Sequence, residues 1–171
     1  VKMGKTNSII LNYDESSYNL FRWYQQLVAE SLGKNSKGVL PIISEMPKDN
    51  HSLMQLYLDG NKNCFFTFFD VINQKSPNIN CKKIYGNFSY LKKHNLQSIK
   101  SAQKEATKKV FNHKKIPYRS FEVLKKNEES LGELFTFFML ETILLGQMMN
   151  LNPFDQPAVE LIKNETKRIL L

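Results

Sequence analysis

Ser8–Gly33 reads SIILNYDESSYNLFRWYQQLVAESLG, in which a strand pattern passes directly into a helix pattern. The short apolar run Ser8–Tyr13 predicts a buried strand. Asp14–Ser17 then offers acidic and hydroxyl side chains of the kind that cap helix N-termini. Apolar residues recur at helical spacing up to Gly33, which is placed to end the helix. The chain therefore opens with a strand–helix unit.

Strand and helix patterns continue to alternate along the chain. Cys64–Val71 (CFFTFFDV) is the clearest strand because it is short, aromatic and rich in residues that favour strands. Strands are also expected at Val39–Ile43, where Pro41 argues against a central place in a sheet, and at Pro117–Leu124. Asn73–Gly86 is expected to be irregular. The other predicted elements are helices: one with apolar positions Leu53, Leu56 and Leu58, one mostly covering Tyr90–His113, one over Ser130–Met149, and one that begins near Pro157.

This alternation predicts an α/β layer structure with a mostly parallel sheet. A length of 171 residues suits one domain of ordinary size or a large piece of a bigger one. Because 42% of the residues are hydrophobic, a disordered chain is excluded. The two cysteines cannot form a disulfide framework for a chain this long, so we expect a soluble protein of the reducing cytoplasm.

The formal charge of +8 does not by itself favour a nucleic acid as partner. Only three of the 24 basic residues are arginine, the residue type that nucleic-acid readers use for bidentate contacts. We expect no membrane segment either. The first residues lack the apolar core of a signal peptide. The apolar stretch Leu134–Met149 is interrupted by Glu141 and Gln147, and we expect a buried helix there rather than a bilayer span.

Three blocks of sequence resemble the glucose-6-phosphate isomerases in their compact bacterial form. They are Ala29–Lys34 (AESLGK), Asp49–Gly60 (DNHSLMQLYLDG) and Asn152–Leu161 (NPFDQPAVEL), and they occur in the order of that family. The similarity runs from about Lys5 to the C-terminus. It implies a sugar-isomerase (SIS) fold, a three-layer sandwich followed by C-terminal helices. Residues 1–171 would then form the C-terminal domain of a larger isomerase, without its N-terminal half.

The resemblance also implies an activity and a set of site residues. The activity is the isomerisation of glucose 6-phosphate and fructose 6-phosphate through a cis-enediol, with no metal and no cofactor. Glu30 matches the general base, His51 the ring-opening residue and Lys163 the active-site lysine. Gln156 matches a substrate contact. The implied assembly is a homodimer in which each site takes its histidine from the neighbouring subunit.

These residue types suit that chemistry. The single carboxylate of Glu30 can take the proton from C2 and return it to C1. Ring opening needs a group such as the His51 imidazole, which gives and takes protons near neutral pH. Gln156 and Lys163 are seven residues apart and share a helix face with Glu160, which can hold the lysine as an i, i+3 partner. The scattered histidines and cysteines show no metal-ligand spacing.

Some features depart from the family pattern and leave other interpretations open. Ile162 stands where the family usually has a glycine. Neither a Ser/Thr-rich phosphate loop nor a Gly-Gly-Arg segment occurs, and Arg22 lies inside a helix pattern. Taken singly, Glu30, His51 and Lys163 are also ordinary surface side chains. The alternatives are therefore a non-catalytic sugar-phosphate-binding module and, third, a basic domain that binds nucleic acid.

Overall fold

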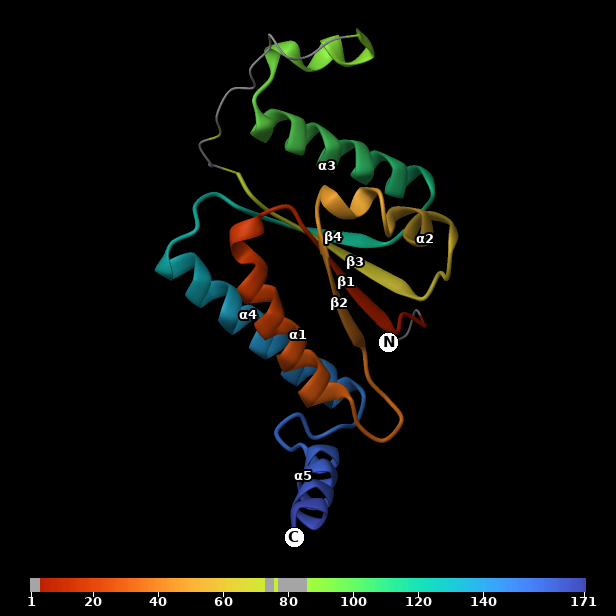
Figure 1. Ribbon diagram of the computed structural model, residues 1–171, viewed down its shortest axis with the longest axis vertical. Helices are drawn as coiled ribbons and strands as arrows, with labels where there is room; N and C mark the ends of the chain where they lie inside the picture. The colour runs from red at the N-terminus through yellow and green to blue at the C-terminus, as the bar shows by residue number, and fades with distance from the viewer. Residues whose placement is uncertain (1–3, 73–75, 77–85) are drawn as a thin grey trace.

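A four-stranded parallel sheet forms the centre of the fold (Figure 1). The computed structural model describes residues 4–72, 76 and 86–171. The sheet has the order β2-β1-β3-β4. This confirms the predicted α/β class, and the predicted irregular segment Asn73–Gly86 lies outside the described residues except for Ser76 and Gly86. The strands are β1 (Asn7–Asn12), β2 (Leu40–Glu45), β3 (Cys64–Val71) and β4 (Tyr118–Val123).

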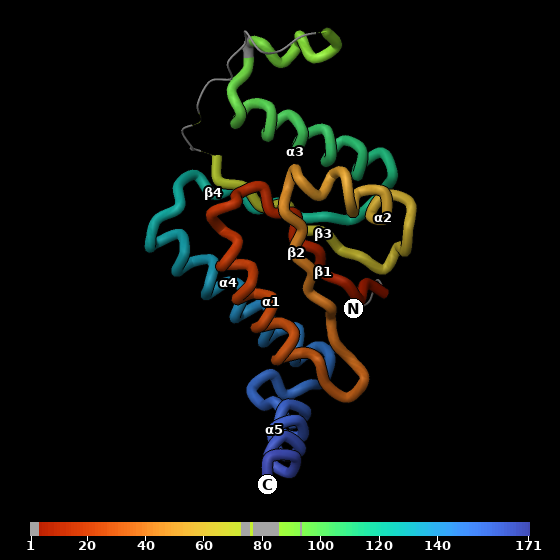
Figure 2. Tube along the Cα trace, viewed as in Figure 1, coloured from red at the N-terminus to blue at the C-terminus, as the bar shows by residue number. Residues whose placement is uncertain are grey.

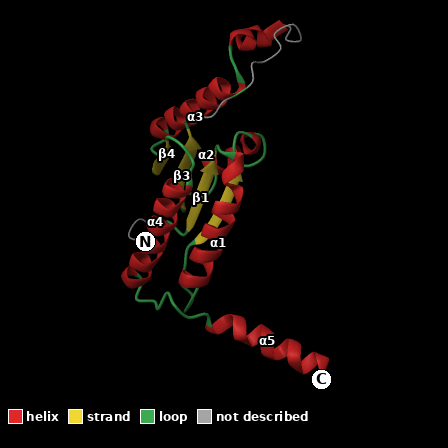
Figure 3. Ribbon diagram, turned by 90° about the vertical axis from the view of Figure 1, so that its left-hand side faces the viewer, coloured by secondary structure: helices red, strands yellow, loops and turns green. Residues whose placement is uncertain are grey.

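Helices cover both faces of the sheet (Figures 1 and 2). One layer holds α1 (Tyr18–Leu32) and α4 (Glu128–Met148), and the other holds α2 (Met54–Asp59) and α3 (Leu96–His113). The fold is thus the expected three-layer sandwich. α5 (Pro157–Leu170) projects from the end of the molecule where α1 and α4 finish (Figure 3). Short 3₁₀ turns precede the first three helices: η1 (Glu15–Ser17), η2 (Lys48–Asn50) and η4 (Gly86–Lys93).

The core lies on both faces of the central strands. On β1, Ile10 points toward α1 and α4, where it joins Phe21 and Phe138, whereas Ile9 and Leu11 point toward α2 and α3. All five side chains are completely buried. Because both faces are covered, the strands consist of nearly continuous apolar residues, which explains the clear strand signal in the sequence.

β2 is an edge strand, and this position accommodates its proline. Pro41 has no N–H to donate, and its carbonyl oxygen accepts a hydrogen bond from Gln25 Nε2 of α1 at 2.9 Å. At the other end of β2, the N–H of Glu45 donates to Asp49 Oδ2 at 2.8 Å. Side chains from neighbouring segments therefore satisfy backbone groups at both ends of this strand.

Two helices start at asparagine caps that the apolar pattern does not reveal. α4 begins at Glu128, two residues before the predicted start, because the Asn127 side chain accepts a bond from Ser130 N in a capping box. The predicted helix over Tyr90–His113 is interrupted, because Asn95 is extended and caps α3 through Ser98 N at 2.8 Å.

α4 is only half buried, in contrast to the expectation of a buried helix. Its buried residues are Leu134, Phe138, Thr142 and Gly146, one stripe four residues apart. Large apolar side chains on the other side are exposed, from 41% for Phe137 to 63% for Met148. Within the described residues, α4 is also the one helix whose length and composition alone would suffice to cross a membrane.

Candidate active site

The structure brings Glu30 and Gln156 together, although 126 residues separate them. Glu30 lies in the last turn of α1, and Gln156 immediately precedes α5. Gln156 Nε2 donates to Glu30 Oε2 at 3.0 Å, and Gln26 Nε2 donates to Glu30 Oε1 at 3.1 Å. Two neutral donors therefore hold both oxygens of a carboxylate that remains partly open to solvent.

An ion pair lies beside this carboxylate. Lys34 follows the end of α1, and its Nζ donates to Asp155 Oδ1 at 2.6 Å and also to the carbonyl oxygen of Asn152. The Lys34 side chain is only 8% exposed, whereas that of Asp155 is 53% exposed. The hydrogen bond from Lys34 lowers the pKa of the Asp155 carboxyl below its usual range, so this carboxylate is charged at neutral pH.

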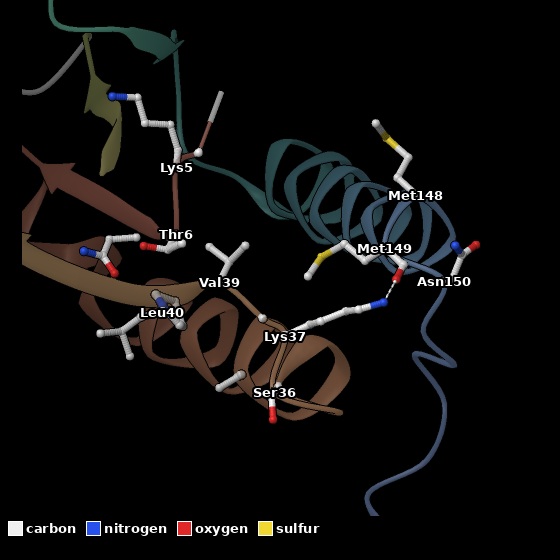
Figure 4. A pocket seen from close by; sticks show the side chains of 15 residues that line it. Lys5, Thr6, Ser36, Lys37, Val39, Leu40, Met148, Met149 and Asn150 are labelled. Carbon is white, nitrogen blue, oxygen red and sulfur yellow. Dashed lines mark hydrogen bonds between the residues drawn. The ribbon is translucent and has the colours of Figure 1, made fainter. Parts of the chain in front are cut away.

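A cavity of about 750 Å³ opens at the amino end of the sheet, next to the last turn of α1 (Figure 4). Ala29 and Gly33, which lie on either side of Glu30 in the sequence, line it, although Glu30 itself does not. Lys37 reaches across it and donates to the Met149 carbonyl oxygen at 3.0 Å. Segments that begin β1 and β2 form the opposite wall, which places the end of α1 at the amino end of the sheet.

His51 lies at the other end of the sheet. It follows η2, just beyond the carboxyl end of β2, and it is exposed. Glu30 and His51 therefore lie at opposite ends of the sheet, about 20 Å apart, which is the length of one strand of this size. One chain does not bring the predicted base and the predicted ring-opening residue together.

Lys163 lies on α5, which has no buried residue. Its Nζ is 2.6 Å from Glu160 Oε1, the i, i+3 partner that the spacing predicted, and its side chain is 64% exposed. Ile162, the departure from the family pattern, is 72% exposed on the same helix. Gln156 is held against α1 by its bond to Glu30, whereas α5 as a helix projects away from the sheet (Figure 3).

Lys34 and Asp155 were not among the residues predicted from the sequence. Both lie inside the blocks that carry the family resemblance, close to Glu30 and directly before Gln156. That proximity is the signal that could have found them. As for metals, the described part of the chain holds no group of three or more histidine, cysteine, aspartate and glutamate side chains able to bind an ion.

Comparison with known proteins confirms the resemblance, although no protein-family profile matches the chain. The chain is 36% identical to the probable glucose-6-phosphate isomerase of Methanococcus maripaludis, over 92% of this chain and 35% of that protein. It is 33% identical to the glucose-6-phosphate isomerase of Methanocaldococcus jannaschii, over 99% of this chain and 42% of that protein. The chain thus spans roughly two fifths of the length of these relatives.

Two crystal structures share the fold. A hypothetical protein from Thermus thermophilus superposes with a TM-score of 0.87 at 26% identity, over 99% of this chain and 43% of that one. A glucose-6-phosphate isomerase from Chlamydia trachomatis superposes with a TM-score of 0.78 over 98% of this chain and 35% of that one. At 15% identity, the second match supports the fold alone.

Proposed function

We propose that this chain, a relative of the glucose-6-phosphate isomerases, is the C-terminal portion of an enzyme that interconverts glucose 6-phosphate and fructose 6-phosphate. The observation that carries the proposal is the hydrogen bond from Gln156 to Glu30. It joins two of the three family-like sequence blocks from distant parts of the chain. It also holds a carboxylate in a fixed orientation, as a general base requires.

Glu30 is the proposed base of an enediol mechanism. Its carboxylate takes the proton from C2 of the open-chain aldose, the C2–H electron pair forms the C1–C2 double bond, and the former carbonyl oxygen O1 takes up a proton to give the cis-enediol. The same carboxyl then returns its proton to C1 while the O2 hydroxyl gives up its own proton, so that the carbonyl moves from C1 to C2 and the proton gained at O1 is balanced by the one lost from O2. Gln156 positions the carboxylate and contacts the sugar. Because one group performs both transfers, no net proton is exchanged with the protein.

His51 is the proposed ring-opening residue, and it acts on the site of a neighbouring copy. The strand-length separation between His51 and Glu30 within one chain supports this arrangement. A closed two-fold dimer would place each His51 beside the Glu30 of the other subunit and form two equal sites. We therefore infer a homodimer.

Lys163 is the proposed cation that faces the sugar ring oxygen or the developing enediolate charge. The helix that carries it starts directly after Gln156, so its first turn is anchored beside Glu30. Glu160, whose Oε1 accepts a hydrogen bond from the Lys163 Nζ at 2.6 Å, limits the positions that this ammonium can take. We place the enzyme in the cytoplasm, where sugar phosphates occur and where its cysteines stay reduced.

The test is a coupled assay for glucose 6-phosphate formed from fructose 6-phosphate. It uses the complete polypeptide that carries this chain, beside its Glu30→Gln variant, which keeps the shape of the side chain but not the base. We expect kcat to fall by about 10³-fold, a usual loss on removal of a general base. Glu133→Gln, an exposed carboxylate on α4, is the matched control and should retain full activity.

The assay tests the role of Glu30, and together with a binding measurement it decides between the two candidate functions. Activity that survives Glu30→Gln would exclude Glu30 as the base. If the complete wild-type polypeptide binds 6-phosphogluconate saturably and yet gives no turnover, it is a non-catalytic sugar-phosphate-binding module. The 171-residue chain, assayed alone in parallel, measures how much of the site this part supplies.

A further inference from the structure

We propose that Lys34 is a positioning residue, which fixes the segment Asn152–Gln156 against the end of α1 and so holds Gln156 on Glu30. The inference rests on the proposed role of Glu30. Lys34 is suited to this task because it bonds to both ends of the segment's turn, the Asn152 carbonyl oxygen and the Asp155 carboxylate. Gln156, which follows immediately, then reaches Glu30.

The end of α1 is built to aim Lys34 at this segment. Gly33 ends the helix, and its N–H donates to the Ala29 carbonyl oxygen at 3.0 Å. A Cβ atom at position 33 would lie 2.7 Å from that oxygen, so a glycine is needed for the chain to turn so closely. The turn folds Lys34 back over the helix end, where its side chain is left only 8% exposed.

Polar contacts, rather than apolar packing, hold the segment beyond Pro153 in place. Every residue from Phe154 to the C-terminus is exposed, and Phe154 itself is 78% exposed. The segment also makes an internal turn, in which Phe154 N donates to Asn152 Oδ1 at 3.1 Å. The bonds of Lys34 and the Gln156–Glu30 bond are thus what links this turn to α1. The bond from the Lys34 ammonium to the Asp155 carboxylate joins two charged groups, and such charge-assisted bonds are stronger than bonds between neutral groups.

Nuclear magnetic resonance on the chain itself tests the geometry. In Lys34→Met, which keeps the length of the side chain and removes its charge, hydrogen exchange of the Gln156 side-chain amide should accelerate at least about tenfold. The carboxyl carbon resonance of Glu30 should shift at the same time, because it loses a donor. Lys34→Arg, which can still reach Asp155, should restore both signals.

Lys37→Met is the matched control. Lys37 lies on the same loop and also bonds to a carbonyl oxygen, that of Met149, but it touches neither Asp155 nor Gln156. Its removal should leave the Glu30 resonance and the Gln156 exchange unchanged. Unchanged signals in Lys34→Met, or equal changes in Lys37→Met, would overturn the inference.

Kinetics on the complete polypeptide then separate this inference from the proposed function. We expect Lys34→Met to lower kcat/KM at least about tenfold, with recovery in Lys34→Arg and no change in Lys37→Met. If the wild type has no isomerase activity, the proposed function fails, and the resonance data still decide whether Lys34 positions Gln156. If the wild type is active and Lys34→Met is fully active too, the positioning role is wrong.

Discussion

Lys104 of α3 and Asp70 of β3 form an almost completely buried ion pair, with Nζ 3.1 Å from Oδ2 and side chains only 7% and 2% exposed. Lys100, one turn earlier on α3, donates to the other oxygen of the same carboxylate at 2.9 Å. The Lys104 ammonium also reaches Glu122 of β4 at 3.1 Å. Charged groups therefore fasten α3 to two neighbouring strands.

We expect Lys104→Met to lower the free energy of unfolding by about 2 kcal/mol, as judged by urea denaturation. Loss of one partner of a buried pair is strongly destabilising, and the effect is moderated here because Lys100 still faces Asp70. Lys48→Met is the control. That lysine is 80% exposed and pairs with Glu45, so its loss should change stability by less than about 0.5 kcal/mol. Equal effects in the two variants would contradict the prediction.

The stability of the protein should depend on pH through Glu122. Hydrogen bonds from Lys108 and then Lys104 lower the pKa of the Glu122 carboxyl in the folded protein. The ionised carboxylate therefore stabilises the fold above its unfolded pKa, and this contribution is lost as the pH falls through the lower folded pKa. The wild type should unfold at higher urea concentration than Glu122→Gln at neutral pH, and the two should converge as the pH drops below about 4.

The matched control for this pH dependence is Glu165→Gln, which changes an exposed carboxylate on α5 that pairs with Arg168. Its urea midpoint should differ little from that of the wild type at any pH. A difference between the wild type and Glu122→Gln that stayed constant from neutral to acidic pH would show that the carboxylate's charge is not responsible.

The core between α1 and α4 should depend strongly on Phe138. This side chain is completely buried and contacts the rings of Phe21, Tyr24 and Phe121. Phe138→Ala should lower the free energy of unfolding by about 4 kcal/mol. Phe138→Leu should lower it by about 1 kcal/mol, and this variant serves as the measurement where the alanine variant is too unstable to fold. Phe154→Ala, at a side chain 78% exposed, should have almost no effect on the denaturation curve.

A shared site predicts that two inactive variants restore each other. Glu30→Gln and His51→Asn, each in the complete polypeptide, should be inactive alone. When they are co-expressed with different tags in equal amounts, about half of the dimers are mixed, and each mixed dimer contains one wild-type site. The total activity should then recover to about a quarter of the wild-type value. No recovery in purified mixed dimers would mean that both residues act within one chain.

The strands were largely predictable from the sequence because a strand buried on both faces consists of nearly continuous apolar residues. The predicted range Cys64–Val71 coincides with β3, whose inner residues are buried. The positions at which helices start were harder to predict from the sequence. The caps Asn95 and Asn127 act through hydrogen bonds to backbone N–H groups, which leave no mark on apolar periodicity.

The contacts of the candidate site could not be predicted from the periodicity of the sequence. Glu30 and Gln156 were linked by family resemblance, because no local pattern connects residues 126 positions apart. The burial of the Lys34 side chain could not be predicted from its local sequence, because a lysine is usually exposed and this burial depends on a turn distant in the sequence. The separation of Glu30 from His51, by contrast, follows from topology: a helix after a parallel strand returns to the amino end of the sheet, while η2 stays at the carboxyl end.

The backbone of β2 also determines where this sheet can grow. Pro41 offers no donor and its carbonyl oxygen is already bonded to Gln25, and the N–H of Glu45 is bonded to Asp49. An incoming strand would find these positions occupied, which is how natural proteins protect an edge against unwanted pairing. β4, at the opposite edge, contains no proline. Strand addition by another polypeptide, in assembly or in aggregation, is therefore disfavoured at β2.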